Sequence, residues 1–161
     1  MDLESEVMRA LKVIYLKRGI CVQSGAAVKE LIEDAEAFAR AAEGEFSEAV
    51  GKGDRILIRD AAEKAWNAVV QATNALILAL AGKMPMSHYE RRVLLRELEK
   101  RYPVVKDLGL RDRYMARYKI LHGETFYEGI VDIEELKVEL EKVRQYVEDV
   151  KRVVGAHTAG N

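Results

Sequence analysis

Two side chains in the second half of the sequence have the types that metal-free cleavage of RNA requires. Arg117 and His122 are separated by four residues. Such a reaction needs a group with a pKa near neutrality to take the proton of a ribose 2′-hydroxyl, and a fixed cation for the charge that builds up on phosphorus. Histidine and arginine suit these two tasks. We therefore take Arg117 and His122 as candidate catalytic residues, with Tyr118, Glu124 and Tyr127 of the same segment as supporting residues.

The same spacing admits an interpretation in which both residues are structural. The chain has fourteen arginines, so an arginine four to six positions ahead of a histidine arises readily by chance. Five positions along an α-helix turn the two side chains about 140° apart, so one chain would not easily direct both to one phosphate. A two-fold dimer that brings two copies of this helix together could do so. In the structural alternative, His122 packs beside Tyr118 and Phe126 while Arg117 pairs with an acidic residue.

Positive charge is concentrated next to these candidates. Residues 91–119 hold ten Lys/Arg and four Asp/Glu, a net +6, within a chain whose net charge is −1. A local basic patch lets a nearly neutral protein hold a phosphate backbone. The alternative is a solvated face whose charges pair with acidic helices. The candidate nucleic-acid contacts are Arg91, Arg92, Arg96, Arg111, Arg113 and Lys119.

The pattern of potential ligands indicates no metal and no cofactor. His88, His122 and His157 are far apart in the sequence, and Cys21 is the single cysteine. No pair of them has the spacing of a zinc or iron site. The turn at residues 51–53 lacks the length and the Lys-Ser/Thr ending of a phosphate-binding loop. Since a lone cysteine forms no internal disulfide, we expect a cytoplasmic protein.

Hydrophobic periodicity predicts the elements that must position these residues. The expected fold is all-α, an up-and-down bundle of five to six helices. The expected N-caps are Ser24, Asp54, Ser87 and Asp132, and the expected C-terminal stops include Gly82 and Gly123. The helices are expected at about 3–18, 26–50, 54–81, 88–102, 107–122 and 133–154.

Two of these helices carry further information. The helix at 54–81 is apolar nearly all round in its C-terminal half, which is typical of a helix at the centre of a bundle. The last helix has a strict heptad seam, which requires a long antiparallel or dimeric partner. The seam consists of Ile133, Leu136, Leu140, Val143, Val147, Val150 and Val154.

Length and composition set the remaining expectations. A chain of 161 residues, 49% hydrophobic and 33% charged, fits one folded unit rather than a disordered or disulfide-stapled chain. We expect a single domain at 1–154, with an N-terminal helix and connector at 1–25, and a flexible tail at 155–161. The continuous apolar run at 75–81 is far shorter than the ~20 residues that span a bilayer, and we expect no signal peptide. The high charge and few Gln and Asn residues are typical of a thermophile.

Two segments resemble a known family. Residues 60–68, Asp-Ala-Ala-Glu-Lys-Ala-Trp-Asn-Ala, resemble the Ala-x-Glu-Lys-x-Trp/Tyr-x-Ala helix of the archaeal PaREP family. Residues 116–129, with Leu121-His122 and then Phe126-Tyr127-Glu128, look like that family's Leu-His…Phe-Tyr-Glu signature. The segments occur in the right order with the right helices between them, and the resemblance covers about residues 30–154.

That family in turn resembles the HEPN (higher eukaryotes and prokaryotes nucleotide-binding) superfamily, whose members are helical bundles that commonly dimerise. The resemblance implies one of two activities. Many members are metal-independent ribonucleases of toxin–antitoxin or defence systems, with an Arg-x(4–6)-His motif at the dimer interface. Others are non-catalytic and bind nucleotides or partner proteins. Arg117 and His122 fall on the motif, but Tyr118 stands where Asn, Asp or His is common, which bears on activity more than on fold.

Three functional hypotheses result. The favoured one is a non-catalytic homodimeric module that binds a nucleotide, RNA or a partner protein, such as a nucleotidyltransferase-like or antitoxin subunit. The second is a metal-independent ribonuclease that uses Arg117 and His122 across the dimer interface. The third is a purely structural helical dimer. None of them involves a membrane or a metal.

Overall fold

The structure, a computed structural model, describes residues 21–160, and all its regular elements are helices. This confirms the predicted all-α bundle. The helix expected at 3–18 lies outside the described residues. The elements are α2 (Cys21–Lys52), α3 (Arg55–Ala81), α4 (His88–Arg101), α5 (Pro103–Asp107), α6 (Leu110–Arg117), the π-helix η1 (Tyr118–Tyr127) and α7 (Ile133–Ala159).

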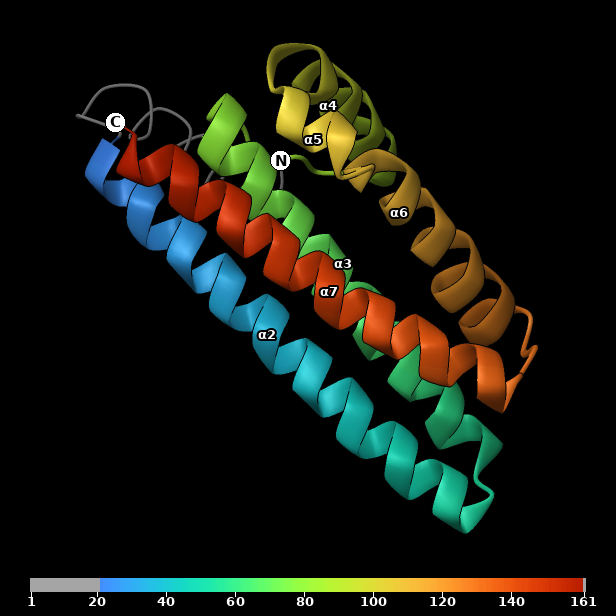
Figure 1. The fold of residues 1–161 in the computed structure, drawn as a ribbon. Coiled ribbons are helices and arrows are strands. Elements are labelled where there is room, and N and C mark those ends of the chain that lie inside the picture. Colours follow the sequence, from blue (N-terminus) through green and yellow to red (C-terminus); the bar gives the residue numbers. More distant parts are fainter. Residues whose placement is uncertain (1–20, 161) are drawn as a thin grey trace, which may run out of the picture.

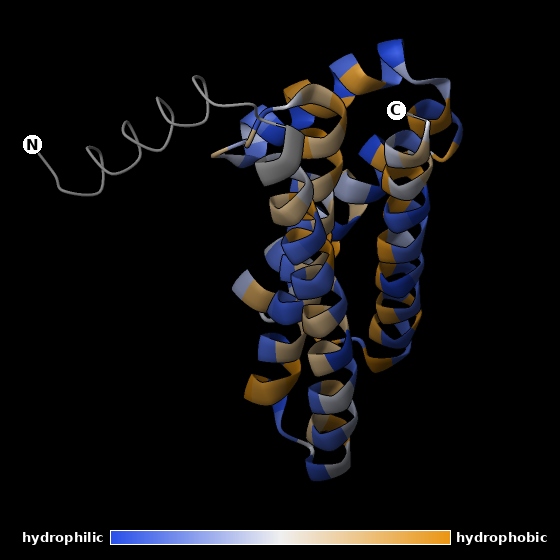
Figure 2. Cartoon of the chain, turned by 90° about the vertical axis from the view of Figure 1, so that its left-hand side faces the viewer, coloured by the Kyte–Doolittle hydropathy of each residue, from blue (hydrophilic) through white to orange (hydrophobic). Residues whose placement is uncertain are grey.

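Three long helices, α2, α3 and α7, run side by side along the molecule (Figure 1). Helix α6 and its continuation η1 form a fourth rod, which packs against α3 and α7. The short helices α4 and α5 lie at one end and connect α3 to this rod (Figure 1). Figure 2 shows hydrophilic and hydrophobic residues alternating along the long helices, as amphipathic helices in a bundle require. None of the helices in residues 21–160 is long and apolar enough to cross a membrane.

Helix α3 forms the centre of the bundle, as its composition predicts. Its C-terminal half is buried almost continuously, and α2, α4, η1 and α7 all contact it. Small residues allow α2 to pack closely against α3, because alanine side chains leave little between the two backbones. The fully buried alanines are Ala35, Ala42 and Ala49 in α2 and Ala61, Ala65, Ala68, Ala72 and Ala75 in α3.

The heptad seam of α7 packs within the chain. Six of its seven residues are buried, and α7 lies against α3 and α2. The exception is Ile133, at the start of the helix, which is 36% exposed. The partner that the seam requires is therefore intramolecular, and the seam itself gives no support to a dimer formed by two copies of α7.

The predicted ends of the helices next to the site are confirmed. Asp54 caps α3 by accepting from the backbone N–H groups of Ile56 and Leu57, and Asp132 caps α7 by accepting from Glu135. Ser87 caps α4 by accepting from the N–H of Glu90 at 3.1 Å. At its other end, α3 stops at Gly82, whose φ of 64° is left-handed.

Four predicted boundaries are wrong. Residue Ser24 lies inside α2, which is helical from Cys21, so it is not an N-cap. The helix expected at 107–122 is interrupted after Asp107, because Gly109 adopts a φ of 60° and α6 starts at Leu110. Gly123 has no positive φ and does not end a helix; the left-handed glycine that follows η1 is Gly129, at 72°.

The fourth wrong boundary is the flexible tail expected at 155–161. Helix α7 continues to Ala159 without a break at Gly155. Two interactions hold this last part: the ring of His157 lies 5.7 Å from that of Tyr102, and the Thr158 hydroxyl donates to the carbonyl oxygen of Val154 at 2.7 Å. The terminal turns are thus anchored to the α4–α5 end of the bundle.

Candidate functional site

His122 lies in η1 and points toward α3, where it meets a carboxylate. Its Nδ1 is 2.8 Å from Oε2 of Glu63. Both side chains are partly exposed, at 20% for His122 and 25% for Glu63, so the pair lies at the surface rather than in the core. A carboxylate partner fixes the orientation of an imidazole ring and selects its tautomer. His122 is therefore held in one orientation with part of its ring open to solvent.

The π-helix aligns aromatic rings with His122. Hydrogen bonds of a π-helix join residues five apart, so each turn holds more residues than a turn of an α-helix. Side chains four positions apart therefore lie closer to one line along the helix axis. Tyr118 and His122 are stacked with ring centroids 5.5 Å apart and an interplanar angle of 28°. His122 and Phe126 are stacked at 6.1 Å and 21°. The widened turn thus produces a row of three rings on one side of η1.

Two arginines of α3 hold the far end of η1 in place. Arg59 donates to the carbonyl oxygen of Phe126 at 3.0 Å from Nε and 2.5 Å from Nη2, and Arg55 donates to that of Gly129 at 3.1 Å. These bonds satisfy carbonyl groups that a helix end leaves without partners. The end of η1 is therefore fixed against the same helix that supplies Glu63.

Trp66 forms the floor of this cluster. It is 2% exposed, and its ring lies 5.0 Å from that of Tyr114, 5.4 Å from Tyr118 and 6.1 Å from His122. Trp66 follows Glu63 by three positions, so both side chains lie on the same side of α3. One face of α3 thereby supplies Glu63, the carboxylate partner of His122, and Trp66, on which the rings next to His122 pack.

A second histidine completes the cluster from another helix. His88 is the first residue of α4, and its ring lies 5.0 Å from that of Tyr118 and 5.9 Å from that of His122. Its Nδ1 is 3.2 Å from the Tyr114 hydroxyl and 3.4 Å from Nη1 of Arg91. Burial, followed by the charges of Arg91, His122 and Arg92, lowers the pKa of His88. His88 is therefore neutral at neutral pH.

This lowered pKa makes the stability of the fold depend on pH. The unfolded chain binds a proton at His88 near pH 6.5, whereas the folded protein does so only at lower pH. Stability is unaffected by His88 above that range and falls as the pH drops below about 6.5, because protons then favour the unfolded chain. We expect the free energy of unfolding, measured by urea denaturation, to fall between pH 8 and pH 5.5. The fall should be smaller in His88→Gln than in the wild type.

Side chains from four helical segments surround His88. Arg91 and Arg92 lie on its own helix, Tyr114 on α6, Tyr118 and His122 on η1, and Trp66 on α3. The cations among them oppose protonation of His88, and no carboxylate contacts its ring in the described residues. If His88→Gln and the wild type lose the same stability between pH 8 and pH 5.5, the lowered pKa of His88 is contradicted.

Arg117 does not join His122. Its guanidinium faces α7, where Nε and Nη2 donate to the carboxylate of Glu139 at 3.0 and 3.3 Å. The side chains of Arg117 and Glu139 are 6% and 2% exposed, and Lys142 also donates to Glu139 at 2.8 Å. Within this chain, Arg117 and His122 are thus directed at two different helices. The contacts match the structural alternative stated for this motif: His122 packs with Tyr118 and Phe126, and Arg117 pairs with an acid.

The predicted basic residues divide into two groups. Arg113 points inward, with Nη1 at 2.8 Å from Oδ2 of Asp149, and Arg111 lies 3.7 Å from Glu99 with its Nε buried. These two partly exposed arginines act as ion-pair partners of acidic residues on neighbouring helices. Part of the net positive charge in residues 91–119 is therefore matched by acidic residues of α4 and α7.

The other predicted basic residues remain at the surface. Arg91 and Arg92 flank His88: Nε of Arg91 donates to Asn74 at 2.7 Å, and the guanidinium of Arg92 lies 5.8 Å from the ring of exposed Tyr89. Arg96 and Lys119 are exposed, at 3.6 Å from Glu97 and 3.8 Å from Glu124. Of the supporting residues, Tyr118 stands in the row of rings, Glu124 pairs with Lys119, and Tyr127 is 71% exposed beside His122 at 5.3 Å.

Three members of the cluster were missed by sequence reasoning: Glu63, Trp66 and His88. Glu63 and Trp66 had one usable signal, since they are the Glu and Trp of the motif at residues 60–68, but Glu63 precedes His122 by 59 positions and the motif does not show which side chain it meets. His88 had one usable signal, since it immediately follows a strong N-cap and so starts a helix in the basic stretch. No group of three or more potential metal ligands occurs in the described residues.

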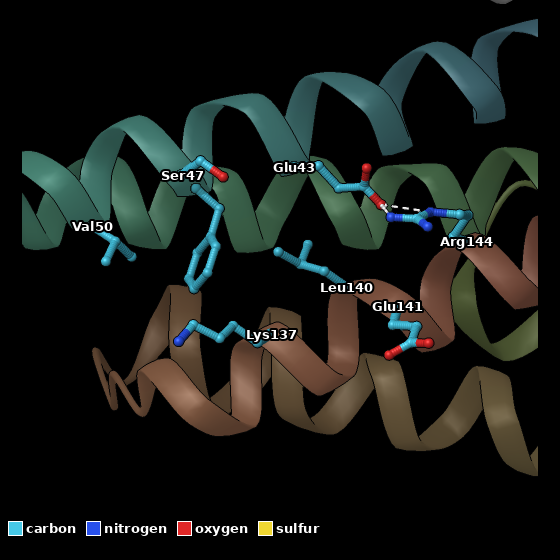
Figure 3. A pocket seen from close by; sticks show the side chains of 8 residues that line it. Glu43, Ser47, Val50, Lys137, Leu140, Glu141 and Arg144 are labelled. Carbon is cyan, nitrogen blue, oxygen red and sulfur yellow. Dashed lines mark hydrogen bonds and ion pairs between the residues drawn. The ribbon is translucent and has the colours of Figure 1, made fainter.

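A groove lies between α2 and α7, on another face of the bundle. Its apolar lining comes from Phe46, Val50 and Leu140, and Arg144 bridges its rim to Glu43 at 2.6 Å. Figure 3 shows the α2 side chains on one side and the α7 side chains on the other. The groove contains no histidine and no stacked rings, so the cluster around His122 is the better candidate for binding or chemistry.

Comparison with known protein families gives a match over most of the chain. The archaeal PaREP1/PaREP8 family matches residues 30–147. No curated protein matches the chain. The matched range contains every residue of the cluster around His122 and the Arg117–Glu139 pair.

Proposed function

The chain belongs to the archaeal PaREP1/PaREP8 family, and we propose that it binds single-stranded RNA at the cluster formed by Glu63, Trp66, His88, Tyr118, His122, Phe126 and Tyr127, hereafter the histidine–aromatic cluster. The observation that carries this proposal is the row of stacked rings formed by Tyr118, His122 and Phe126, with the exposed ring of Tyr127 edge-on beside it. Proteins that hold single strands stack bases on aromatic side chains and track the backbone with positive charge.

The charges near the cluster support the same ligand. Arg91 and Arg92 lie next to His88, and both are at least partly exposed. A strand whose bases stack on the rings of the cluster would bring its phosphates toward these cations, since the ring of His88 lies 5.0 Å from that of Tyr118 and Nδ1 of His88 lies 3.4 Å from Nη1 of Arg91. The resemblance to HEPN proteins supports a role as the non-catalytic, homodimeric member of a toxin–antitoxin or defence-type system, with a nucleotidyltransferase-like or antitoxin partner.

Removal of the exposed ring tests this proposal. We expect Tyr127→Ala to raise the Kd for a fluorescently labelled single-stranded RNA by about 5- to 140-fold, because stacking of one base on an aromatic side chain contributes about 1–3 kcal/mol. Tyr127→Phe keeps the ring and should bind as the wild type does. Fluorescence anisotropy at fixed ionic strength measures all three proteins, since salt alone shifts such affinities.

Two controls make the result specific. Arg144→Ala removes a surface arginine from the α2–α7 face and should leave RNA binding unchanged. Competition with AMP tests whether the ligand is a single nucleotide or a strand. If AMP displaces the RNA at a concentration close to the Kd of the RNA, the ligand is a mononucleotide. Wild-type affinity in Tyr127→Ala would refute binding at this surface.

Metal-independent cleavage by Arg117 and His122 across a dimer is the second candidate. The observation in its favour is the His122–Glu63 pair, which orients an imidazole at the surface as a general base requires. The buried Arg117–Glu139 pair counts against it, because Arg117 would have to leave Glu139 to reach a phosphate. Incubation of RNA in EDTA, followed by analysis for 2′,3′-cyclic phosphate ends, separates cleavage from binding.

A further inference from the structure

The two histidines of the cluster are held in opposite hydrogen-bonding states. A carboxylate only accepts hydrogen bonds. Because Nδ1 of His122 lies 2.8 Å from Oε2 of Glu63, Nδ1 carries the proton and donates it. In the neutral ring, Nε2 of His122 then has a lone pair and acts as an acceptor.

His88 has the reverse arrangement. A guanidinium only donates hydrogen bonds, so Nδ1 of His88, at 3.4 Å from Nη1 of Arg91, accepts. The Tyr114 hydroxyl, 3.2 Å from the same nitrogen, can donate to it as well. The single proton of neutral His88 is therefore on Nε2, and Nε2 acts as a donor. The lowered pKa of His88 agrees with a neutral ring.

The two histidine rings are close enough for one ligand to contact both. The rings of His88 and His122 lie 5.9 Å apart, and both contact Tyr118 and Trp66. Within residues 21–160, neither Nε2 has a hydrogen-bond partner. Both side chains are only partly buried. The cluster therefore presents one acceptor and one donor, side by side, beside a row of rings.

In RNA a donor and a set of acceptors occur on neighbouring atoms: the ribose 2′-hydroxyl donates, and the oxygens of the adjacent 3′-phosphate accept. DNA has the phosphate but lacks the hydroxyl. We propose that Nε2 of His122 accepts a hydrogen bond from a ribose 2′-hydroxyl while Nε2–H of His88 donates to the adjacent phosphate, so that the cluster selects RNA over DNA. This inference rests on the proposed RNA binding and specifies what the cluster recognises.

Four oligonucleotides of one sequence test the inference on the unmodified protein: RNA, DNA, 2′-O-methyl RNA and 2′-fluoro RNA. Only the first has a 2′ donor. We expect RNA to bind about 3- to 10-fold more tightly than each of the others, as one net hydrogen bond predicts. Equal binding of RNA and 2′-O-methyl RNA would overturn the inference, because the methyl ether accepts but does not donate.

Two variants assign the two contacts. His122→Phe keeps a ring in the row but removes the acceptor, so RNA should bind as weakly as DNA. His88→Phe removes the phosphate contact, which both nucleic acids share, so both affinities should fall while the preference for RNA remains. Circular dichroism confirms that each variant is folded, and partly exposed Glu63 remains accessible to water in His122→Phe.

The outcomes separate this inference from the proposed function. A preference for RNA that survives in His122→Phe would overturn the assignment to His122. Equal binding of RNA and DNA by the wild type would overturn the inference while leaving single-strand binding in place. Failure of all four oligonucleotides to bind would overturn the proposed function and this inference together.

Discussion

Glu139→Ala is expected to lower the free energy of unfolding by about 3–5 kcal/mol, because it leaves the guanidinium of Arg117 buried without its counter-charge. In the wild type, this carboxylate is 2% exposed and accepts from both Arg117 and Lys142. Lys142 is half exposed and can turn toward water, but Arg117 is enclosed between α6 and α7. Urea denaturation at pH 7.5 measures the loss.

The matched control replaces both partners. Arg117→Met with Glu139→Leu removes the ion pair and leaves two apolar side chains of similar size, which is often neutral for stability. We expect this double variant to be much more stable than Glu139→Ala. If Glu139→Ala is instead as stable as the wild type, Arg117 is not held by Glu139 in solution. The double variant also tests the cleavage hypothesis. If cleavage of RNA depends on Arg117, this variant should fold but have no ribonuclease activity.

Trp66→Ala is the second change with a large expected effect. Truncation of a buried tryptophan costs about 3–5 kcal/mol, through lost apolar contact and the cavity that remains. Here the cavity would lie directly under His88, Tyr114, Tyr118 and His122, whose rings all contact the indole. We therefore expect a lower melting temperature together with loss of RNA binding, measured by calorimetry and by fluorescence anisotropy.

A conservative substitution separates the two effects. Trp66→Phe retains an aromatic floor and should recover most of the stability and part of the affinity for RNA. Leu76→Ala provides a control at another fully buried position of α3, away from the rings of the cluster. It should lower stability without changing the affinity of the folded protein at low temperature. Wild-type RNA affinity in folded Trp66→Ala would refute the role of Trp66 in supporting the cluster.

Several parts of the fold could be predicted because their causes are local. Asp54, Ser87 and Asp132 cap helices through bonds to residues two or three positions away, which a sequence displays directly. The apolar C-terminal half of α3 and the heptad seam of α7 likewise indicate burial on their own. The seam did not reveal its partner, because the same pattern suits a neighbouring helix and a second chain equally well.

The candidate site was predicted only in part, and the reason lies in two particular features. The first is η1: an extra residue per hydrogen-bonded turn leaves no clear mark in the sequence, so the sequence pattern predicts a helix end at Gly123 and does not indicate the row of rings. The second is Arg117, whose partner Glu139 lies 22 positions away on another helix. Spacing along one helix says nothing about which neighbour a side chain meets.

The sequence by itself determined the helical class, the main helix ends and the family, since these depend on periodicity, capping and short motifs. The tertiary structure alone decided which side chains surround His122. Glu63 and Trp66 from α3, His88 from α4 and Tyr118 from η1 meet there because four helical segments pack against each other. Helix packing depends on the fit of whole surfaces that are distant in sequence, so it brought His88 to His122 and sent Arg117 to Glu139.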